Sequence, residues 1–374
     1  MAEKTRRRST MSRFLRTVAL LVDLAAVCAL VLTAYAGMVS PLSHSAWWGV
    51  LPLGFPFAFW GVTALLLLQL LWHRRGAVVC ALGMLLCAGP VLAYFPVNIG
   101  GKKAPEGKET FTMMSFNAHQ FLPPDSVPWA YPIPNPSIEY VLQADVDIVC
   151  LQEASYIISR TSQLMSGEQI RRMHEQYPYI IGSDEICLMS KFPTEAIHLD
   201  VNDKSFPGGW AACYRVTLPG GRNITIFDVH LHSMRLRSDD REVWNNITEL
   251  KREDITQVRT HLLDKLAAAA VGRAKDVLQL QRYIRLYGGP DVIVCGDFND
   301  VSGCHAIRSL ADSGFRSVWP ETGLGPLITF NSDRMYFGID HILYRGDLHP
   351  LSMHRGGLRS SDHYPLIATF YVDK

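Results

Sequence analysis

The chain has 374 residues and a formal net charge of +1, but its two parts differ in charge. Residues 1–100 hold eight Lys and Arg and two acidic residues, which leaves 28 basic and 33 acidic residues in 101–374. This mildly acidic balance disfavours a broad electrostatic grip on nucleic acid, although it permits a local basic patch. The eight cysteines include no CxxC pair and no zinc-binding spacing, so a structural zinc site is not expected.

Three apolar stretches fill most of the first hundred residues: Leu15–Val39, Ala46–Trp72 and Gly76–Phe95. Each is about as long as the ~20 residues that a helix needs to cross a bilayer. We therefore predict three transmembrane helices within 15–98, with the membrane lipid bilayer as their partner. A basic N-terminus, 1–14, precedes them.

The basic residues indicate how these helices are oriented. Four arginines precede the first apolar stretch and Arg16 lies at its start, while Arg74 and Arg75 lie between the second and the third. Because cytoplasmic segments are enriched in Lys and Arg, both groups belong on the cytoplasmic side. The sequence thus predicts an integral, multi-pass membrane protein whose catalytic domain is extracytoplasmic, in the periplasm or outside the cell. Lys102 and Lys103, just after the third stretch, argue weakly against this orientation.

A polar linker over 99–110 separates the apolar segment from a predicted domain at 111–374, where strand-like runs alternate with helical patterns. Val243–Tyr287 is typical of one or two helices. The expected strands are Thr112–Phe116, Val146–Leu151, Ile186–Met189, Ala211–Val216, Asn223–His230, Asp291–Cys295, Ile339–Tyr344 and Pro365–Val372. Many strands with few but long helical segments indicate two packed sheets with helices outside them.

Polar residues gather where these strands end, and polar residues are disfavoured inside strands. The groups are Ser115-Phe116-Asn117, Leu151-Gln152-Glu153, Asp228-Val229-His230-Leu231-His232, Gly296-Asp297-Phe298-Asn299-Asp300, Ile339-Asp340-His341 and Ser361-Asp362-His363. A lone member of this set would be a turn or cap residue. Together, oxygen ligands and imidazoles without a thiolate array favour Mg²⁺, with Mn²⁺ as the alternative. Such a metal neutralises phosphate charge and orients a hydrolytic water.

The same groups, with Ser-Lys-Phe-Pro at 190–193, occur in the order found in the endonuclease/exonuclease/phosphatase superfamily, which 111–374 resembles. That superfamily includes pancreatic-type deoxyribonucleases, exonuclease III-type repair enzymes, inositol polyphosphate 5-phosphatases and neutral sphingomyelinases. The resemblance implies an α/β fold, a four-layer α/β sandwich of two packed mixed sheets flanked by helices. It also implies Mg²⁺-dependent phosphoester hydrolysis by a domain that follows a three-helix transmembrane segment in the chain.

Carried over by position, the resemblance makes Glu153 the principal metal ligand, assisted by Asn117 and Asp362. Asp297 would orient or deprotonate the attacking water, and Asn299 would hydrogen-bond the phosphoryl oxygens.

The resemblance also assigns the imidazoles. His363 would stabilise charge in the transition state while Asp340 fixes its tautomer. His230 would be the second imidazole at the phosphate. His232 points to the same sheet face if the strand alternation continues, so either could be the active residue, and the motif favours His230. In some nucleases of the superfamily a carboxylate pairs with the imidazole that corresponds to His230. Residues 206–210, where that carboxylate would be expected, include none.

Ser190 and Lys191 are expected to support the substrate side of the site, with a plain surface role for Lys191 as an equal alternative. The substrate could be DNA, RNA, a phospholipid headgroup or a small phosphoester. Nuclease or phosphodiesterase activity is favoured by analogy alone. The rival hypotheses are a non-catalytic membrane protein that binds a partner and, more remotely, a transporter, for which the apolar segment lacks paired charges. No obligate protein partner is expected.

Overall fold

The computed structural model describes residues 2–122, 132–154, 157, 161–183, 185–199, 209–234, 255–332 and 335–373. Two six-stranded mixed sheets form its centre. The first sheet has the order β13 (Leu348–Arg355), β14 (Leu366–Val372), β1 (Glu109–Asn117), β2 (Ile148–Gln152), β4 (Ile186–Ser190) and β3 (Tyr179–Gly182). The second has the order β5 (Thr194–Ile197), β6 (Trp210–Thr217), β7 (Asn223–His230), β8 (Val292–Asp297), β12 (Asp340–Arg345) and β9 (Arg316–Ser317). A hairpin of β10 (Phe330–Ser332) and β11 (Met335–Phe337) lies beside them.

The central strands are buried on both faces, which is why they are continuously apolar rather than alternating. In β1, Phe111 and Met113 point into the core between the sheets, whereas Met114 and Phe116 point into an outer core. Phe111 stacks on Phe370 of the neighbouring β14 with ring centroids 5.3 Å apart. Full burial of each such side chain stabilises the fold by about 1.5–3 kcal/mol.

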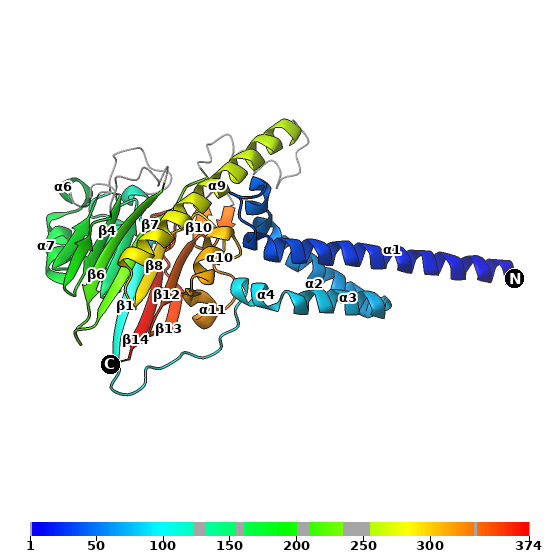
Figure 1. Cartoon of the computed structure of the whole chain (residues 1–374), viewed down its shortest axis with the longest axis horizontal. Helices are drawn as coiled ribbons and strands as arrows, with labels where there is room; N and C mark the ends of the chain where they lie inside the picture. The colour runs from blue at the N-terminus through cyan, green and yellow to red at the C-terminus, as the bar shows by residue number, and fades with distance from the viewer. Residues whose placement is uncertain are drawn as a thin grey trace.

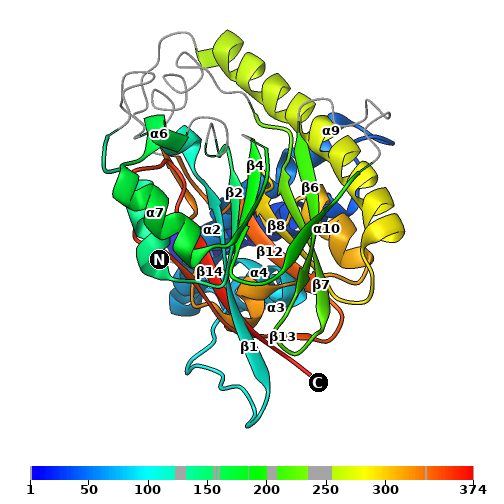
Figure 2. The ribbon, with the colours of Figure 1, turned by 90° about the vertical axis from the view of Figure 1, so that its left-hand side faces the viewer.

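Helices cover the outer face of each sheet and complete the four layers (Figure 2). The helices α5 (Pro136–Ala144) and α7 (Gly167–Gln176) close the outer core of the first sheet, while α9 (Ile255–Tyr287) and α10 (His305–Asp312) close that of the second. The described residues of the domain also form three short helices: η4 (His119–Phe121), α6 (Thr161–Leu164) and α11 (Val318–Thr322). The predicted four-layer α/β sandwich is confirmed. The part of the predicted helix before residue 255 lies outside the described residues.

The N-terminal residues form apolar helices that project from the sandwich (Figure 1). They are α1 (Ala2–Tyr35), η1 (Ala36–Met38), η2 (Ala46–Gly49), η3 (Leu51–Gly54), α2 (Phe55–Trp72), α3 (Arg74–Leu86) and α4 (Ala88–Tyr94). Arg13–Met38 and Ala46–Trp72 are each long and apolar enough to cross a membrane. The pair α3–α4 could be a third span only as a bent one, because its two helices meet at 68°.

The bend between α3 and α4 has a local cause that the sequence prediction of one continuous third helix did not use. Pro90 has no backbone N–H, so it cannot donate a helical hydrogen bond to the carbonyl of Leu86. The hydroxyl of Tyr35 in α1 donates to that carbonyl instead, over 2.7 Å. The interrupted helix is thus satisfied by its neighbour in the bundle.

Contacts between the bundle and the sandwich include those of η1, which follows α1, and those of the end of α4 and the residues after it. The carbonyl of Gly37 lies 3.1 Å from Nδ1 of His305 in α10. The N–H of Gly303 donates to the hydroxyl of Tyr94 over 3.2 Å, and the amide of Asn98 donates to the carbonyl of Gly323 over 2.8 Å. These contacts place the sandwich at the end of the bundle where the first apolar stretch finishes and the second begins.

Candidate active site

Six chain segments bring polar side chains to one end of the sandwich. The strands β1 and β2 are parallel, and Asn117 pairs with Gln152, so Asn117 and Glu153 leave the first sheet at the same edge. The strands β7 and β8 are also parallel, and His230 pairs with Asp297. Asp340 begins the antiparallel β12 directly opposite Asp297. The carboxyl ends of parallel strands are where α/β sheets place ligands.

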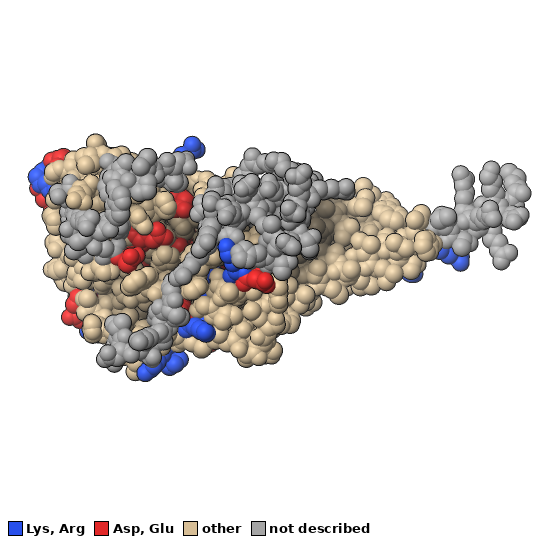
Figure 3. All heavy atoms as spheres, turned by 90° about the horizontal axis from the view of Figure 1, so that it is seen from above, with Lys and Arg blue, Asp and Glu red and all other residues tan. Residues whose placement is uncertain are grey.

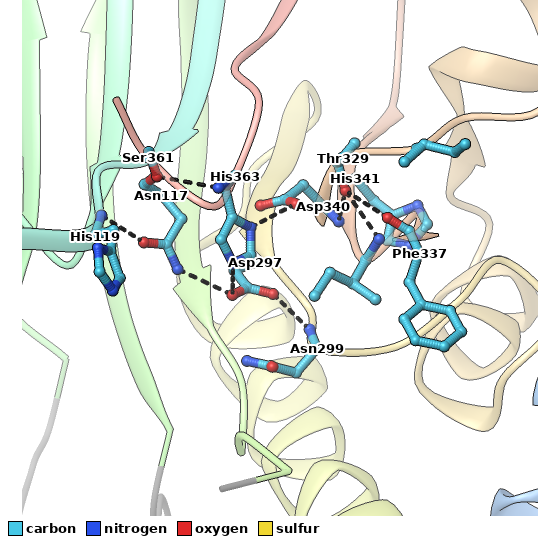
Figure 4. A network of polar contacts seen from close by, with 12 residues as sticks. Asn117, His119, Asp297, Asn299, Thr329, Phe337, Asp340, His341, Ser361 and His363 are labelled. Carbon is cyan, nitrogen blue, oxygen red and sulfur yellow. Dashed lines mark hydrogen bonds and ion pairs between the residues drawn. The ribbon is translucent and has the colours of Figure 1, made fainter. Parts of the chain in front are cut away.

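A buried carboxylate–imidazole–carboxylate group lies at the centre of this end (Figure 4). Nδ1 of His363 donates to Oδ2 of Asp340 over 2.9 Å, and Nε2 of His363 lies 3.7 Å from Oδ2 of Asp297. Burial alone would lower the pKa of His363, but the charges of Asp340 and Asp297 raise that pKa from 6.5 to about 10. Burial also raises the pKa of Asp297, against the opposing effect of His363. His363 is therefore a cation at neutral pH, and Asp297 is a more basic carboxylate than usual.

The side-chain amide of Asn117 joins this group to Glu153. Its Nδ2 donates to Oε1 of Glu153 over 3.1 Å and to Oδ2 of Asp297 over 3.0 Å. The ring of His230 faces the same two carboxylates, with Nε2 at 3.9 Å from Glu153 and 3.8 Å from Asp297. The Glu153 side chain keeps 27% of its surface exposed, so this carboxylate faces the opening of the site.

Unusual backbone conformations hold two of these side chains. Glu153 and Asn299 have φ values of 47° and 49°, in the left-handed region that most side chains avoid. At Asn299 the backbone N–H donates to Oδ1 of Asp297 over 2.7 Å, and the side-chain amide donates to the carbonyl of Leu231 over 3.1 Å. The turn after β8 thereby fixes the orientation of the Asp297 carboxylate.

Several residues that we did not predict support the site. The Ser361 hydroxyl donates to the carbonyl of Asn117 over 3.0 Å and accepts the N–H of His363 over 3.1 Å. The buried Thr329 hydroxyl accepts the N–H of Asp340 over 3.1 Å. Nε2 of His119 lies 4.0 Å from Oδ2 of Asp362. Ser361 and His119 stand within two residues of predicted site residues, so their spacing could have indicated them, whereas Thr329 lies in a segment without such a signal.

The residues at this end fit a divalent cation. Asn117, Glu153, Asp297 and Asp362 offer hard oxygen atoms, which Mg²⁺ and Mn²⁺ prefer. Oδ1 of Asp362 is buried and has no hydrogen-bond partner among the described residues, as expected of an atom that needs a cation. Asp297, Asp340 and His363 also place ligand atoms within 4.8 Å of one another. In that group, however, Nδ1 of His363 already donates a hydrogen bond to Asp340. This favours a role for the three residues in proton transfer and charge stabilisation over a role as metal ligands.

The structure does not bring Ser190 and Lys191 to this site, contrary to the expected role at the substrate, and for Lys191 this agrees with the alternative of a plain surface residue. Because β2 and β4 are antiparallel, Ser190 pairs with Ile148 at the start of β2, at the opposite end of the sheet from Glu153. The Ser190 hydroxyl is buried and accepts the N–H of Phe192. The ammonium of Lys191 forms an ion pair with Asp145 over 2.8 Å, a surface contact.

His232 also lies away from the position that strand alternation predicted. The strand β7 ends at His230, so the alternation does not extend to His232. The His232 backbone N–H donates to Oδ2 of Asp276 over 2.8 Å. Its ring packs against Gly272 of α9, where an added Cβ would lie 2.6 Å from the ring.

Comparison with known families agrees with this geometry. Residues 114–363 match the model of the Endonuclease/Exonuclease/phosphatase family. The match covers more than half of the chain and includes every strand that contributes to the site. The chain therefore belongs to this family, whose members are phosphoester hydrolases that generally use divalent metal ions.

Solved structures of family proteins are similar to this chain at low sequence identity. The humanized D. rerio TDP2 with 14 mutations is 17% identical, with 70% of this chain and 98% of that chain covered at a TM-score of 0.43. A family protein from Bacteroides thetaiotaomicron is 15% identical, with 71% and 99% covered at 0.45. A family protein from Beutenbergia cavernae is 15% identical, with 71% and 72% covered at 0.47. None of the curated proteins matches the chain.

Proposed function

We propose that this protein is a membrane-anchored, Mg²⁺-dependent phosphodiesterase that works at the strand ends described above. The observation that carries the proposal is the buried group of Asp297, His363 and Asp340, joined to Glu153 through Asn117. This group combines a basic carboxylate, a charged imidazole and a partly exposed carboxylate at one opening. A partner-binding protein without catalysis would not need the three in such an arrangement.

Asp297 is proposed to accept the proton of the attacking water. Its raised pKa makes it a better base near neutral pH than an exposed aspartate. The water oxygen bonds to phosphorus, the phosphorus–oxygen ester bond breaks, and the leaving oxygen takes a proton from solvent, which yields an alcohol and a phosphate monoester. Asp297 then releases the proton of the water to solvent. Glu153, Asn117 and Asp362 would hold the cation, which when bound neutralises phosphoryl charge and orients the water.

His363 is proposed to stabilise the negative charge that develops on the phosphoryl group. It suits this role because two carboxylates keep it protonated, and Asp340 leaves only Nε2 free to face the substrate. His230, on the other side of Asp297, is the proposed second imidazole at the phosphate. Among the described residues Asn299 uses one amide N–H on the chain, and the second is proposed to donate to a phosphoryl oxygen.

The apolar helices are proposed to anchor the enzyme with its sandwich on the extracytoplasmic side, because their arginines lie at the far ends from the sandwich. A cysteine at Asp347, whose side chain is 78% exposed, tests this orientation. Of the native cysteines only Cys28 is exposed, so the variant is made in a Cys28→Ser background. A membrane-impermeant maleimide should label the variant in intact cells. Labelling only after lysis would contradict the orientation.

The phosphodiester could belong to a nucleic acid or to a phospholipid headgroup. On the face that it shows, Figure 3 has Lys and Arg in scattered groups rather than one continuous stripe. With the acidic balance of 101–374, this disfavours a long nucleic acid. The full-length protein in lipid nanodiscs should be assayed with Mg²⁺ on DNA, RNA, a model phosphodiester and phospholipid vesicles. Hydrolysis of one class, lost with a chelator and in Asp297→Asn, supports the proposal, and silence across the panel opposes it.

A further inference from the structure

An apolar pocket of about 410 Å³ lies at the junction of the helical bundle and the sandwich. Thr33 of α1, Trp47 of η2 and Phe57 of α2 contribute to one wall, and Leu263 and Leu266 of α9 contribute to the other. Twelve residues line the pocket, and Thr33 carries the only polar side chain apart from the indole of Trp47. The volume is that of a typical small-molecule site, and the lining is suited to a hydrocarbon.

The pocket is placed where a bilayer lipid could enter it. Seven of its twelve residues belong to the two candidate membrane spans, and all seven lie near the ends that face the sandwich. Trp47, which is 44% exposed, stands at the start of the second span, where tryptophan marks the membrane–water interface. Phe57, which is 68% exposed, lies further into the same span. The wall formed by the bundle is thus at the level of lipid headgroups and upper acyl chains.

A small apolar cluster lies between the pocket and the active site. Phe337 and Leu53, both in the pocket lining, pack in one cluster with Phe330. The ring of Phe330 in turn lies edge-on against the imidazole of His363, with centroids 5.0 Å apart. Figure 4 shows Phe337 beside the Asp340 end of the catalytic group. The two rings Phe337 and Phe330 thus connect the lining of the pocket to His363.

From this placement we infer that the pocket binds an acyl chain of a membrane phospholipid whose headgroup phosphodiester is the substrate. The inference rests on the proposed function and names its substrate class. A lipid chain is the occupant that the surroundings supply, because the candidate spans would lie in hydrocarbon while the catalytic group lies above them. A nucleic acid has no group that would fill an apolar pocket of this kind.

The test is photo-crosslinking of the full-length protein in nanodiscs that contain a phospholipid with a diazirine on its acyl chain. We expect label on peptides that contain 47–57 and 262–266. Leu266→Trp, which fills the pocket, should reduce that label at least ten-fold. Leu278→Trp is the matched control, because Leu278 is on the same helix, is 55% exposed and lies outside the pocket. Leu263→Trp, which fills the same pocket from a position one helical turn away in α9, replaces Leu266→Trp in this test if Leu266→Trp does not fold.

Activity gives a second readout. Leu266→Trp should raise the KM for a long-chain phospholipid at least ten times more than the KM for a water-soluble phosphodiester. Equal labelling of the Leu266→Trp and Leu278→Trp proteins would overturn the inference, as would lipid label found only on peptides outside 47–57 and 262–266. Asp297→Asn separates the two proposals: it should lose hydrolysis and keep the label. A labelled but inactive wild-type protein would support the lipid site and contradict the phosphodiesterase.

Discussion

Replacing Asp340 with asparagine tests the central electrostatic feature of the site. The carboxylate lies 2.9 Å from Nδ1 of His363, and at an effective dielectric constant of about 20 two unit charges at that separation attract by about 6 kcal/mol. That energy corresponds to about four pKa units, which burial of the imidazole opposes in part. The net shift of the His363 pKa, from 6.5 to about 10, has the expected direction and size.

Asparagine keeps the shape of the side chain and removes the charge, so the pKa of His363 should fall toward its ordinary value. The imidazole would then be mostly neutral at pH 8, and its tautomer would no longer be fixed. We expect kcat at pH 8 to fall by roughly 10²- to 10⁴-fold, the range for a catalytic imidazole or its orienting carboxylate. The deficit should narrow as the pH is lowered toward 5.5, because acid restores the imidazolium that the wild type keeps up to about pH 10.

The assay is the pH–rate profile of a water-soluble phosphodiester, with the pKa of His363 followed by NMR on selectively labelled protein. Asp312→Asn is the matched control, since Asp312 is an exposed carboxylate at the end of α10. The reasoning is refuted if Asp340→Asn retains the wild-type kcat and pH profile while the NMR titration shows a lowered pKa of His363.

Four further outcomes are expected. Asp297→Asn should lower kcat at least 10³-fold. Burial raises the pKa of Asp297 in the folded protein, so the ionised carboxylate lowers the free energy of unfolding as the pH rises above about 4. The Asp297→Asn protein should therefore unfold at pH 7 at the same temperature as the wild type or at a higher one. Glu153→Gln should weaken Mn²⁺ binding, followed by EPR, by at least the roughly 10- to 100-fold that loss of a residue supporting a metal ligand costs. His230→Gln should lower kcat by about 10²-fold or more, whereas His232→Gln should change it less than ten-fold in the same assay. Lys191→Ala should leave kcat within two-fold and alter the free energy of unfolding, measured with urea, by less than about 1 kcal/mol, because exposed ion pairs contribute little.

The strands that the sequence predicted are those with the densest burial. Each of the eight predicted runs overlaps a strand of the structure, and the most apolar of them, those that form β2 and β8, are buried on both faces. The strands that were not predicted lie at the edges or in short hairpins. In β13 the register shifts between Pro350 and Ser352, and a proline with a bulge is tolerated at a sheet edge while it weakens the sequence signal.

The order of the motifs along the chain was enough to predict that the site residues lie together. The contacts that position these residues could not be predicted from that order. Parallel pairing explains why Asn117 and Glu153, or His230 and Asp297, meet at one edge. The sequence could not show that β4 runs antiparallel to β2, which takes Ser190 to the other end of the sheet.

The membrane segment was predictable in composition and less so in shape. Hydropathy alone indicated three stretches, and two are continuous enough to span a bilayer. The break near Pro90 depends on a proline close to a helix start, and the Tyr35 hydroxyl of another helix satisfies the carbonyl that the break leaves free; hydropathy records neither.

The central claim is that this constellation hydrolyses phosphodiesters with a divalent metal. The most direct measurement is the rate at which the purified full-length protein releases alcohol from a phosphodiester in Mg²⁺, compared with the same protein in chelator and with Asp297→Asn in Mg²⁺. We predict turnover that is saturable in Mg²⁺ and reduced at least 10³-fold in both controls. Turnover that survives both the chelator and the substitution would contradict the account, because neither the metal nor Asp297 would then be needed.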